Sequence, residues 1–277
     1  MTALYTAMIR ARESVRPDRL FDDPLAGALA GPQGDELISW MEATSPGAAD
    51  NPGVIIRTRF FDDALERIVA ESGVNQIVLL AAGLDTRAFR LRLPPGLVLF
   101  EVDQIEVLNI KASRLVELGA VPRCRRVAIP ADLSGDWSIA LCESGFERSR
   151  PAVWLAEGLF HYLTDAQVHH LLTTLSELAA PGSWLCADVL SRWFVILPQL
   201  AGFVAMFAAH GSPLRFGTDE PENLVRAHGW RPQATPYGAP AANFGRWTMP
   251  AAYGDNSNIP YGYLIIAQQQ SRVECSR

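Results

Sequence analysis

Lysine is almost absent from this chain of 277 residues: Lys111 is the only one, and arginine supplies the rest of the positive charge. The formal net charge is −6 at pH 7. Proteins that bind nucleic acid normally present a clustered basic face, and this sequence contains no basic cluster that would form one. The composition therefore predicts no nucleic-acid partner.

The chain has four cysteines, at positions 124, 142, 186 and 275, and no C-x-x-C spacing. Neither cysteine nor histidine is clustered in the way that a zinc site requires, so we expect no metal. Cys124 and Cys186 lie in apolar, strand-like runs, where free thiols are commonly buried. The cysteine pattern therefore predicts a reducing, cytoplasmic setting.

The sequence also lacks an apolar run long enough to cross a membrane, which takes about 20 residues. The most apolar segment, Trp193–Ala209, is shorter and contains Pro198 and Gly202. Charged residues at positions 10, 12, 13 and 16 precede any long apolar run, so the N-terminus does not resemble a signal peptide. We expect no membrane partner.

The most informative segment that is present covers residues 76–90. Residues 77–80 are apolar without alternation, which is typical of a strand covered on both faces. The small residues Ala81, Ala82 and Gly83 follow, and they leave no side chain to keep a ligand away from the main chain. The segment therefore predicts a turn that presents its backbone to a nucleotide-like ligand.

Acidic residues follow several of the predicted strands. Asp85, Asp103, Asp132 and Glu157 fall at or just beyond the carboxyl ends of consecutive strands, where open α/β sheets bind ligands. Asp103 has the position of an acid that binds two ribose hydroxyls, whereas Asp85 is expected to cap the following helix. Thr86 stands where a dinucleotide-binding G-x-G-x-x-G turn has its third glycine, which argues against NAD.

Strand-like and helix-like segments alternate from 60 to 190, which predicts an α/β fold with a mainly parallel sheet. Thr164 and Gln167 form a capping-box pattern that predicts the start of one of the helices. We interpret residues 1–277 as one domain, in which an N-terminal helical segment, 1–58, and an insertion, 191–218, form a cap over the site. Further strands are expected at 98–102, 126–129, 152–156 and 184–190. After residue 218, a short helix that ends at 228–229 and the apolar segment 261–267 are expected to supply the last two strands.

Several motifs together resemble the leucine carboxyl methyltransferase family, and more closely its bacterial branch of S-adenosylmethionine-dependent O-methyltransferases, which includes polyketide-tailoring enzymes. The resemblance implies a class I methyltransferase with a Rossmann-like, seven-stranded sheet and a helical cap. The motifs are Ala-Ala-Gly-Leu-Asp-Thr-Arg-Ala-Phe-Arg-Leu (81–91), Phe-Glu-Val-Asp (100–103) and Glu-Gly-Leu-Phe-His-Tyr-Leu (157–163), with shorter matches at 6–13, 20–26, 57–63, 216–221 and 228–230.

The resemblance also implies how S-adenosylmethionine is bound. Asp103 is expected to hold the ribose hydroxyls, and Asp132 with the backbone of Leu133 the adenine edge. Glu157 is expected to hold the methionine amine. The turn at Ala81, Ala82 and Gly83 is expected to pack beside the methionine chain.

Two further positions concern the cofactor. Arg59 matches an arginine of the family that binds the cofactor carboxylate, a role that Arg57 can share; the alternative for Arg59 is a solvated position on a helix face. The family usually has glycine where this chain has Ala81, so the extra methyl group is expected to crowd the cofactor.

His161 is the best-placed candidate for a catalytic base. A hydroxyl acceptor needs a base, whereas a carboxylate acceptor is already ionised and needs none. An unperturbed imidazole would titrate near pH ~6.5. The alternative is a histidine that is merely hydrogen-bonded at the start of a helix.

The predicted cap contains several large apolar side chains, which suit a flat aromatic or long apolar acceptor. A homodimer interface built from the same side chains is the alternative. These residues are Trp193, Phe194, Phe203, Met206 and Phe207.

The sequence thus predicts an S-adenosylmethionine-dependent O-methyltransferase that acts on a carboxylate or hydroxyl of a hydrophobic small molecule, in secondary metabolism of the polyketide kind. Two alternatives stay open. One is a cofactor-binding scaffold or a catalyst of a rearrangement without transfer. The other is an NAD-dependent dehydrogenase, against which the missing third glycine argues.

Overall fold

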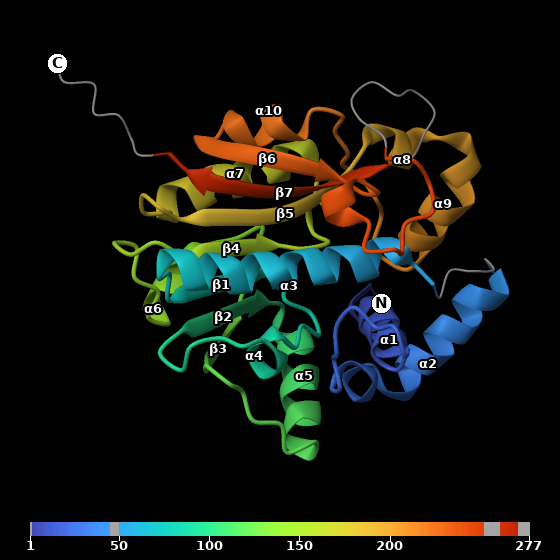
Figure 1. The fold of residues 1–277 in the computed structure, drawn as a ribbon, viewed down its shortest axis with the longest axis horizontal. Coiled ribbons are helices and arrows are strands. Elements are labelled where there is room, and N and C mark those ends of the chain that lie inside the picture. Colours follow the sequence, from blue (N-terminus) through green and yellow to red (C-terminus); the bar gives the residue numbers. More distant parts are fainter. Residues whose placement is uncertain (1, 45–49, 252–260, 271–277) are drawn as a thin grey trace.

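The computed structural model describes residues 2–44, 50–251 and 261–270, so that Cys275 lies outside the described residues. Helices and strands alternate through the middle of the chain (Figure 1). The helices are α1 (Thr2–Ser14), α2 (Ala26–Thr44), α3 (Pro52–Ser72), α4 (Arg87–Arg90), α5 (Ile105–Glu117), α6 (Trp137–Glu143), α7 (Asp165–Leu178), α8 (Arg192–Ile196), α9 (Ala201–Ala209) and α10 (Pro221–Arg226). The strands are β1 (Gln76–Leu80), β2 (Val98–Asp103), β3 (Arg125–Pro130), β4 (Val153–Ala156), β5 (Trp184–Leu190), β6 (Trp230–Pro236) and β7 (Gly262–Gln269).

Within the described residues, seven strands form one sheet in the order β3-β2-β1-β4-β5-β7-β6. The pairs among β1 to β5 are parallel, and β7 runs antiparallel to both of its neighbours. The predicted α/β class with a mainly parallel, seven-stranded sheet is therefore confirmed. β1 lies between β2 and β4: the chain leaves β1 towards β2 and β3, and after β3 it returns to β4 on the other side of β1. The strand order therefore reverses between β1 and β4, and ligands bind beyond the carboxyl ends of strands at such a point.

Both faces of the sheet are covered, as the unbroken apolar run of β1 predicts (Figure 1). Ile77 and Leu79 belong to a core with α1 and α3, while Val78 and Leu80 belong to a second core with α6, α7 and α10. Alternate residues of one strand thus serve two cores, which explains why the sequence shows no polar alternation. α7 begins with the predicted capping box: Thr164 accepts from the backbone of Gln167, and the Gln167 side chain accepts from the backbone of Thr164.

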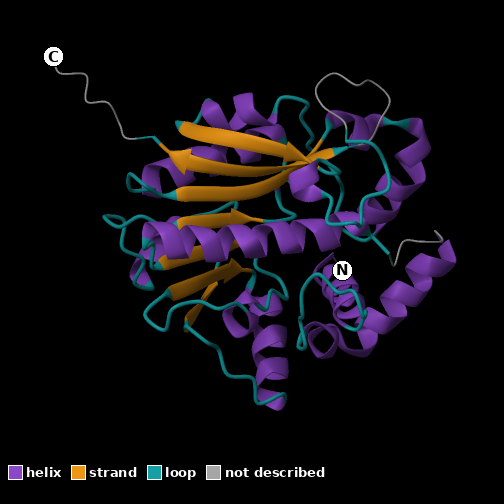
Figure 2. Cartoon of the chain, viewed as in Figure 1, coloured by secondary structure: helices purple, strands orange, loops and turns teal. Residues whose placement is uncertain are grey.

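The ends of the parallel strands are approached by segments that lie far apart in the sequence. Figure 2 shows helices α1 and α2 together with α8 and α9 on the side of the sheet to which β5 points. Residues 191–218 contain α8 and α9 and therefore lie beyond the carboxyl ends of the parallel strands, where a cap is expected. Residue 58, the expected end of the N-terminal segment, falls inside α3, a continuous helix that begins at Pro52 and packs on the sheet.

The sequence did not locate β6, which contains Pro232 and Pro236. Proline cannot donate a hydrogen bond to a neighbouring strand and is therefore confined to sheet edges. β6 is an edge strand that pairs with β7 alone, so its prolines are compatible with the sheet.

Candidate active site

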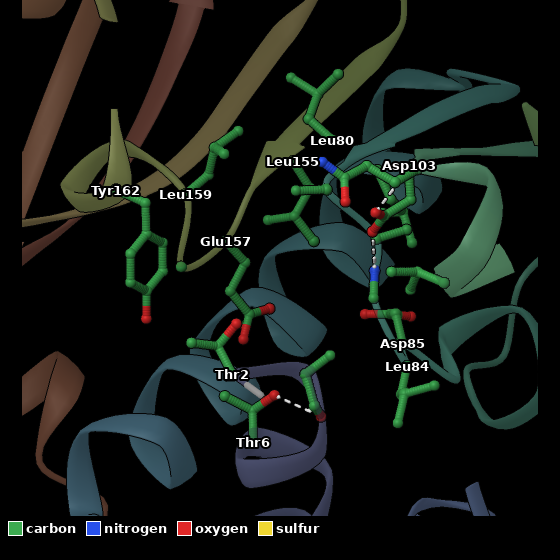
Figure 3. A pocket seen from close by; sticks show the side chains of 18 of the residues that line it. Thr2, Thr6, Leu80, Leu84, Asp85, Asp103, Leu155, Glu157, Leu159 and Tyr162 are labelled. Carbon is green, nitrogen blue, oxygen red and sulfur yellow. Dashed lines mark hydrogen bonds between the residues drawn. The ribbon is translucent and has the colours of Figure 1, made fainter. Parts of the chain in front are cut away.

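A cavity of about 320 Å³ lies at the carboxyl ends of β1, β2 and β4. We call it the first cavity. Its walls include the turn at 81–83, Asp103, Glu157 and residues of α1. Figure 3 shows Asp103 on one side of it, Tyr162 on the other and Glu157 between them. The structure thus brings together the turn and three of the four acids expected at strand ends, Asp85, Asp103 and Glu157.

The turn after β1 is held in an unusual backbone conformation. Ala81 has φ 52° and Gly83 has φ 50°, both in the left-handed region, which glycine tolerates and alanine adopts at a cost. The Gly83 amide donates to Oδ2 of Asp103 at 2.6 Å (Figure 3). A Cβ at position 83 would come within 3.2 Å of Cβ of Ala3. The turn is therefore fitted closely between β2 and α1.

Asp103 links the turn to the next helix. Its Oδ1 accepts from the backbone of Gln104 at 2.7 Å while Oδ2 accepts from Gly83. Burial raises the pKa of Asp103, and these two backbone donors offset only part of that effect. Each oxygen keeps a further lone pair with which to accept a hydroxyl hydrogen.

Glu157 is held by two arginines. Arg57 Nε donates to its Oε1 at 3.1 Å, and Nη2 of Arg87 lies 2.6 Å from Oε2. Burial alone would raise the pKa of Glu157, but Arg87 and then Arg57 lower it below its usual value. Glu157 is therefore an anion at neutral pH, although it lies in a protected cavity.

These contacts belong to a longer chain of buried ion pairs, which we call the charge network. It contains four guanidinium groups and five carboxylates, and it runs from α1 to β5 without a break. Its net charge is therefore negative by one unit. In order of contact the members are Arg10, Asp23, Arg90, Asp62, Arg87, Glu157, Arg57 and Asp188, and Asp85 branches from Arg87.

Asp85 has the expected capping role as well as a place in the charge network. Its Oδ1 accepts from the backbone amide of Arg87, the first residue of α4, at 2.7 Å. Burial would raise the pKa of Asp85, but the surrounding cations, Arg87 foremost, together outweigh it and the pKa falls to about 2.

Three residues expected at the site do not line the first cavity. Arg59 donates to Asp63 on its own helix at 2.8 Å and to the carbonyl of Leu20 at 2.6 Å. Asp132 accepts from the backbone and hydroxyl of Ser134 and is exposed, and Leu133 packs against the sheet core. Arg57, two residues before Arg59, lines the cavity instead.

A second cavity, also about 320 Å³, adjoins the first. The two share Thr2, Thr6, Arg57 and Tyr162, which we call the common wall. The second cavity is mostly apolar. Its apolar and aromatic side chains come from α8, α9, β5 and the segments around β7, and include Phe194, Leu200, Phe207, Leu214, Tyr237, Trp247, Met249 and Tyr261.

Of the aromatic residues expected in the cap, Phe194 and Phe207 line the second cavity. Trp193 packs against the core and under the Arg192 guanidinium, and Met206 packs against the other core. The side chain of Phe203 is outside the described part of the structure.

His161 borders the second cavity and is only 5 % exposed. Its ring lies against Tyr162, with centroids 4.4 Å apart, and its Nδ1 is buried without a hydrogen-bond partner. Burial, assisted by the Arg57 charge, lowers the pKa of His161 to about 3. The ring is therefore neutral at physiological pH and a much weaker base than the imidazole with pKa ~6.5 that the sequence analysis assumed.

Sequence reasoning missed Asp188 and Arg87. Asp188 is the one acid in the otherwise apolar run of β5, and a carboxylate in a buried strand is itself a signal that a partner is required. Arg87 lies within the motif at 81–91 but is 2 % exposed, whereas arginine is usually at the surface. Gly158, with φ 66°, packs against the Arg57 guanidinium, where a Cβ would stand 2.8 Å from Nη2.

The geometry can be compared with known proteins. The family model of leucine carboxyl methyltransferase matches residues 3–176, which include the turn, Asp103 and Glu157. The chain belongs to the leucine carboxyl methyltransferase family. The match spans more than half of the chain, and the shared segment holds most of the first cavity.

Relatives of this leucine carboxyl methyltransferase family member occur in actinobacteria. Two proteins of Frankia alni are 42% identical over 245 residues (83% of this chain, 82% of theirs) and 38% identical over 279 residues (96% and 93%). A protein of Parafrankia sp. is 47% identical over 196 residues, 68% of this chain but only 62% of that relative's length. All three carry names that denote S-adenosyl-L-methionine-dependent methyltransferases.

Solved structures agree on the fold. A DUF574 family protein from Streptomyces avermitilis has a TM-score of 0.63 at 18% identity, covering 95% of this chain and 97% of its own. A protein from Thermobifida fusca described as a methyltransferase has a TM-score of 0.61 at 18% identity, covering 94% and 96%. The fold is that of class I methyltransferases.

The protein is thus an S-adenosylmethionine-dependent methyltransferase, and the dehydrogenase alternative is removed. The residues of the first cavity fit this cofactor, since the cavity offers carboxylates for hydroxyl and amine groups and a turn without large side chains. The excess negative charge of the network suits a cofactor whose sulfonium and amine outweigh its one carboxylate. Among the described residues, no helix has the length and apolarity needed to span a membrane.

The left-handed conformation of Ala81 makes one substitution stabilising. Ala81→Gly is expected to raise the free energy of unfolding by about 1 kcal/mol, because the strain at φ 52° exceeds the entropic cost of glycine. Urea unfolding of both proteins measures the difference. Ala82→Gly is the matched control, and it should destabilise. A loss of stability in Ala81→Gly would show that the turn is not strained.

The buried, neutral His161 also predicts how stability depends on pH. Its pKa is lower in the folded protein than in the unfolded chain, so the unfolded chain takes up a proton first as the pH falls below about 6.5. From pH 7 to pH 5 this should remove about 2 kcal/mol of stability in the wild type, and His161→Gln should abolish that part. Urea unfolding at both pH values, with the exposed His170→Gln as control, provides the measurement. An equal loss in wild type and His161→Gln contradicts the assignment.

Proposed function

We propose that this methyltransferase transfers the methyl group to an oxygen of a hydrophobic small molecule, and that the oxygen belongs to a carboxylate. The observation that carries the proposal is the apolar second cavity, which meets the first cavity at the common wall and is bordered by a neutral, buried histidine. An acceptor in the second cavity faces a cofactor in the first across that wall. Residues 191–218 cap the acceptor.

The arrangement of the first cavity supports the following positions for the cofactor. Asp103 accepts from the ribose hydroxyls, and Glu157, kept anionic by its arginines, accepts from the methionine amine. Arg57 takes the carboxylate-binding role that the resemblance implied for Arg59, because Arg57 lines the cavity and Arg59 does not. In this order the sulfonium, which joins the ribose to the methionine chain, lies between Asp103 and the pair of Glu157 and Arg57, and its methyl group is directed to the common wall, of which Arg57 is a member. For the adenine edge, the resemblance implies Asp132 and Leu133, although neither residue lines the first cavity.

When bound, the cofactor supplies an electrophilic methyl group on a positively charged sulfur. The chain's own residues orient the acceptor and exclude water: aromatic side chains enclose its apolar body, and desolvation strengthens the attraction between an anionic oxygen and the sulfonium. An in-line displacement of this kind gains most of its acceleration from such positioning.

The state of His161 favours a carboxylate over a hydroxyl. A hydroxyl must lose its proton, and an imidazole with a pKa of about 3 is a poor proton acceptor at neutral pH. A carboxylate is already ionised, so its methylation requires no proton transfer to His161. The second candidate acceptor is a phenol. The observation that supports it is that the His161 ring packs against Tyr162, which belongs to the common wall.

Methyl transfer is tested with cofactor labelled in its methyl group and a matched pair of acceptors, naphthoic acid and naphthol. The proposal predicts label in the ester of the acid, which alkali releases as methanol, and little label in the alkali-stable ether. Label in the ether alone would establish hydroxyl methylation. If no acid or phenol of a wider aromatic panel receives label while the cofactor binds, the non-transferring scaffold is the better description.

The role of His161 is measured with His161→Phe. With a carboxylate acceptor the rate constant of transfer should change by less than about 3-fold, whereas loss of a true general base costs ~100-fold or more. The rate with His170→Gln, an exposed change on α7, gives the baseline. A ~100-fold loss in His161→Phe with unchanged cofactor affinity would overturn the carboxylate proposal.

Asp103→Ala should weaken binding of S-adenosylhomocysteine by roughly 1.5 to 3 kcal/mol, because a charged acceptor of hydroxyl hydrogen bonds is removed from a partly buried site. Asp103→Asn, which keeps the shape, should lie between Ala and wild type. Asp132→Ala is the comparison at the neighbouring strand end. Calorimetric titration gives the dissociation constants, and an unchanged value in a folded Asp103→Ala protein would sink the ribose assignment.

A further inference from the structure

Asp188 is a buried carboxylate in the middle of the apolar strand β5, and it is 2 % exposed. Its Oδ1 accepts from the Gly158 amide at 2.5 Å and its Oδ2 from Nη1 of Arg57 at 3.2 Å. Burial raises the pKa of Asp188, and Arg57 only partly offsets this effect. An apolar residue would be less costly to bury at this position, so the carboxylate requires an explanation beyond packing.

The partners of Asp188 lie between the two cavities. Arg57 belongs to the common wall, and Asp188 itself borders the second cavity. The guanidinium is held on three sides: Glu157 lies towards the first cavity, Asp188 towards the second, and the backbone of Gly158 packs against Nη2. Because guanidinium groups are planar and bind carboxylates through fixed directions, these contacts determine its orientation.

We propose that Asp188 is a positioning residue, which holds Arg57 and the backbone at Gly158 in place at the common wall. Asp188 acts through Arg57. The inference rests on the proposed function in one respect, since Arg57 is there assigned to the cofactor carboxylate. Asp188 thereby links the geometry of the acceptor cavity to that of the cofactor cavity.

The test is a set of calorimetric titrations with S-adenosylhomocysteine, which need no acceptor. Asp188→Asn keeps an oxygen for the Gly158 amide but removes the charge that holds Arg57, and it should raise the dissociation constant about 10-fold. In an Arg57→Gln background the same change should have an effect of less than about 2-fold, because the group through which Asp188 acts is gone. Asp63→Asn, which breaks the exposed pair with Arg59, is the matched control and should stay within about 2-fold of wild type.

The possible results separate the inference from the proposed function. If Arg57→Gln leaves the affinity unchanged, the carboxylate-binding role of Arg57 is overturned and the inference with it. If Arg57→Gln weakens binding but Asp188→Asn has no effect, or the same effect in both backgrounds, only the role of Asp188 is overturned. A purely structural residue would give additive losses.

A second variant serves if Asp188→Asn does not fold, as judged by circular dichroism and thermal melting. Gly158→Ala places a Cβ against the Arg57 guanidinium, and alanine is tolerated at a similar φ at position 81. Gly158→Ala should weaken the binding of S-adenosylhomocysteine in the wild-type background, and much less in the Arg57→Gln background. Equal weakening in both backgrounds would contradict the proposal that Asp188 and the backbone at Gly158 position Arg57.

Discussion

The buried charge network is the constraint on which the site depends. Nine charged side chains are removed from water between α1 and β5, a cost that is offset only when each has a well-placed partner of opposite sign. The partners come from distant segments, so the N-terminal helix, α3, the turn after β1 and the ends of β4 and β5 must all dock before the pairs close. The network is weak evidence for stability, but it fixes the relative positions of the groups that line both cavities.

Its charge also fits the chemistry. Five carboxylates against four guanidinium groups leave one negative charge, beside a first cavity that contains Asp103 as well. The cofactor brings the compensating positive charge. The second cavity, which we propose for the acceptor, is different: its only charged lining groups among the described residues, Arg57 and Asp188, already pair with each other.

The sequence predicted what local patterns determine. Apolar runs, interrupted only by Glu101 in β2 and Asp188 in β5, identified β1, β2, β4 and β5. The Thr164 capping box identified the start of α7. These signals depend on neighbouring residues alone. The sequence could not show which of Arg57 and Arg59 faces the cavity. Residues two positions apart on a helix point in directions that differ by roughly 200°, so only one of them lines the cavity. Nor could it show that Ala81 is strained by its backbone, or that burial makes His161 a poor base, since both depend on how distant segments pack.

The central claim is that a cofactor in the first cavity presents its reactive methyl group to the second cavity across the common wall. A crystal structure with S-adenosylhomocysteine bound tests it most directly. The account predicts ribose hydroxyls on Asp103, the amino acid end against the ion pair of Arg57 and Glu157, and the sulfur between these two contacts, on the side of the common wall. A ribose away from Asp103, or a sulfur facing away from the second cavity, would contradict it.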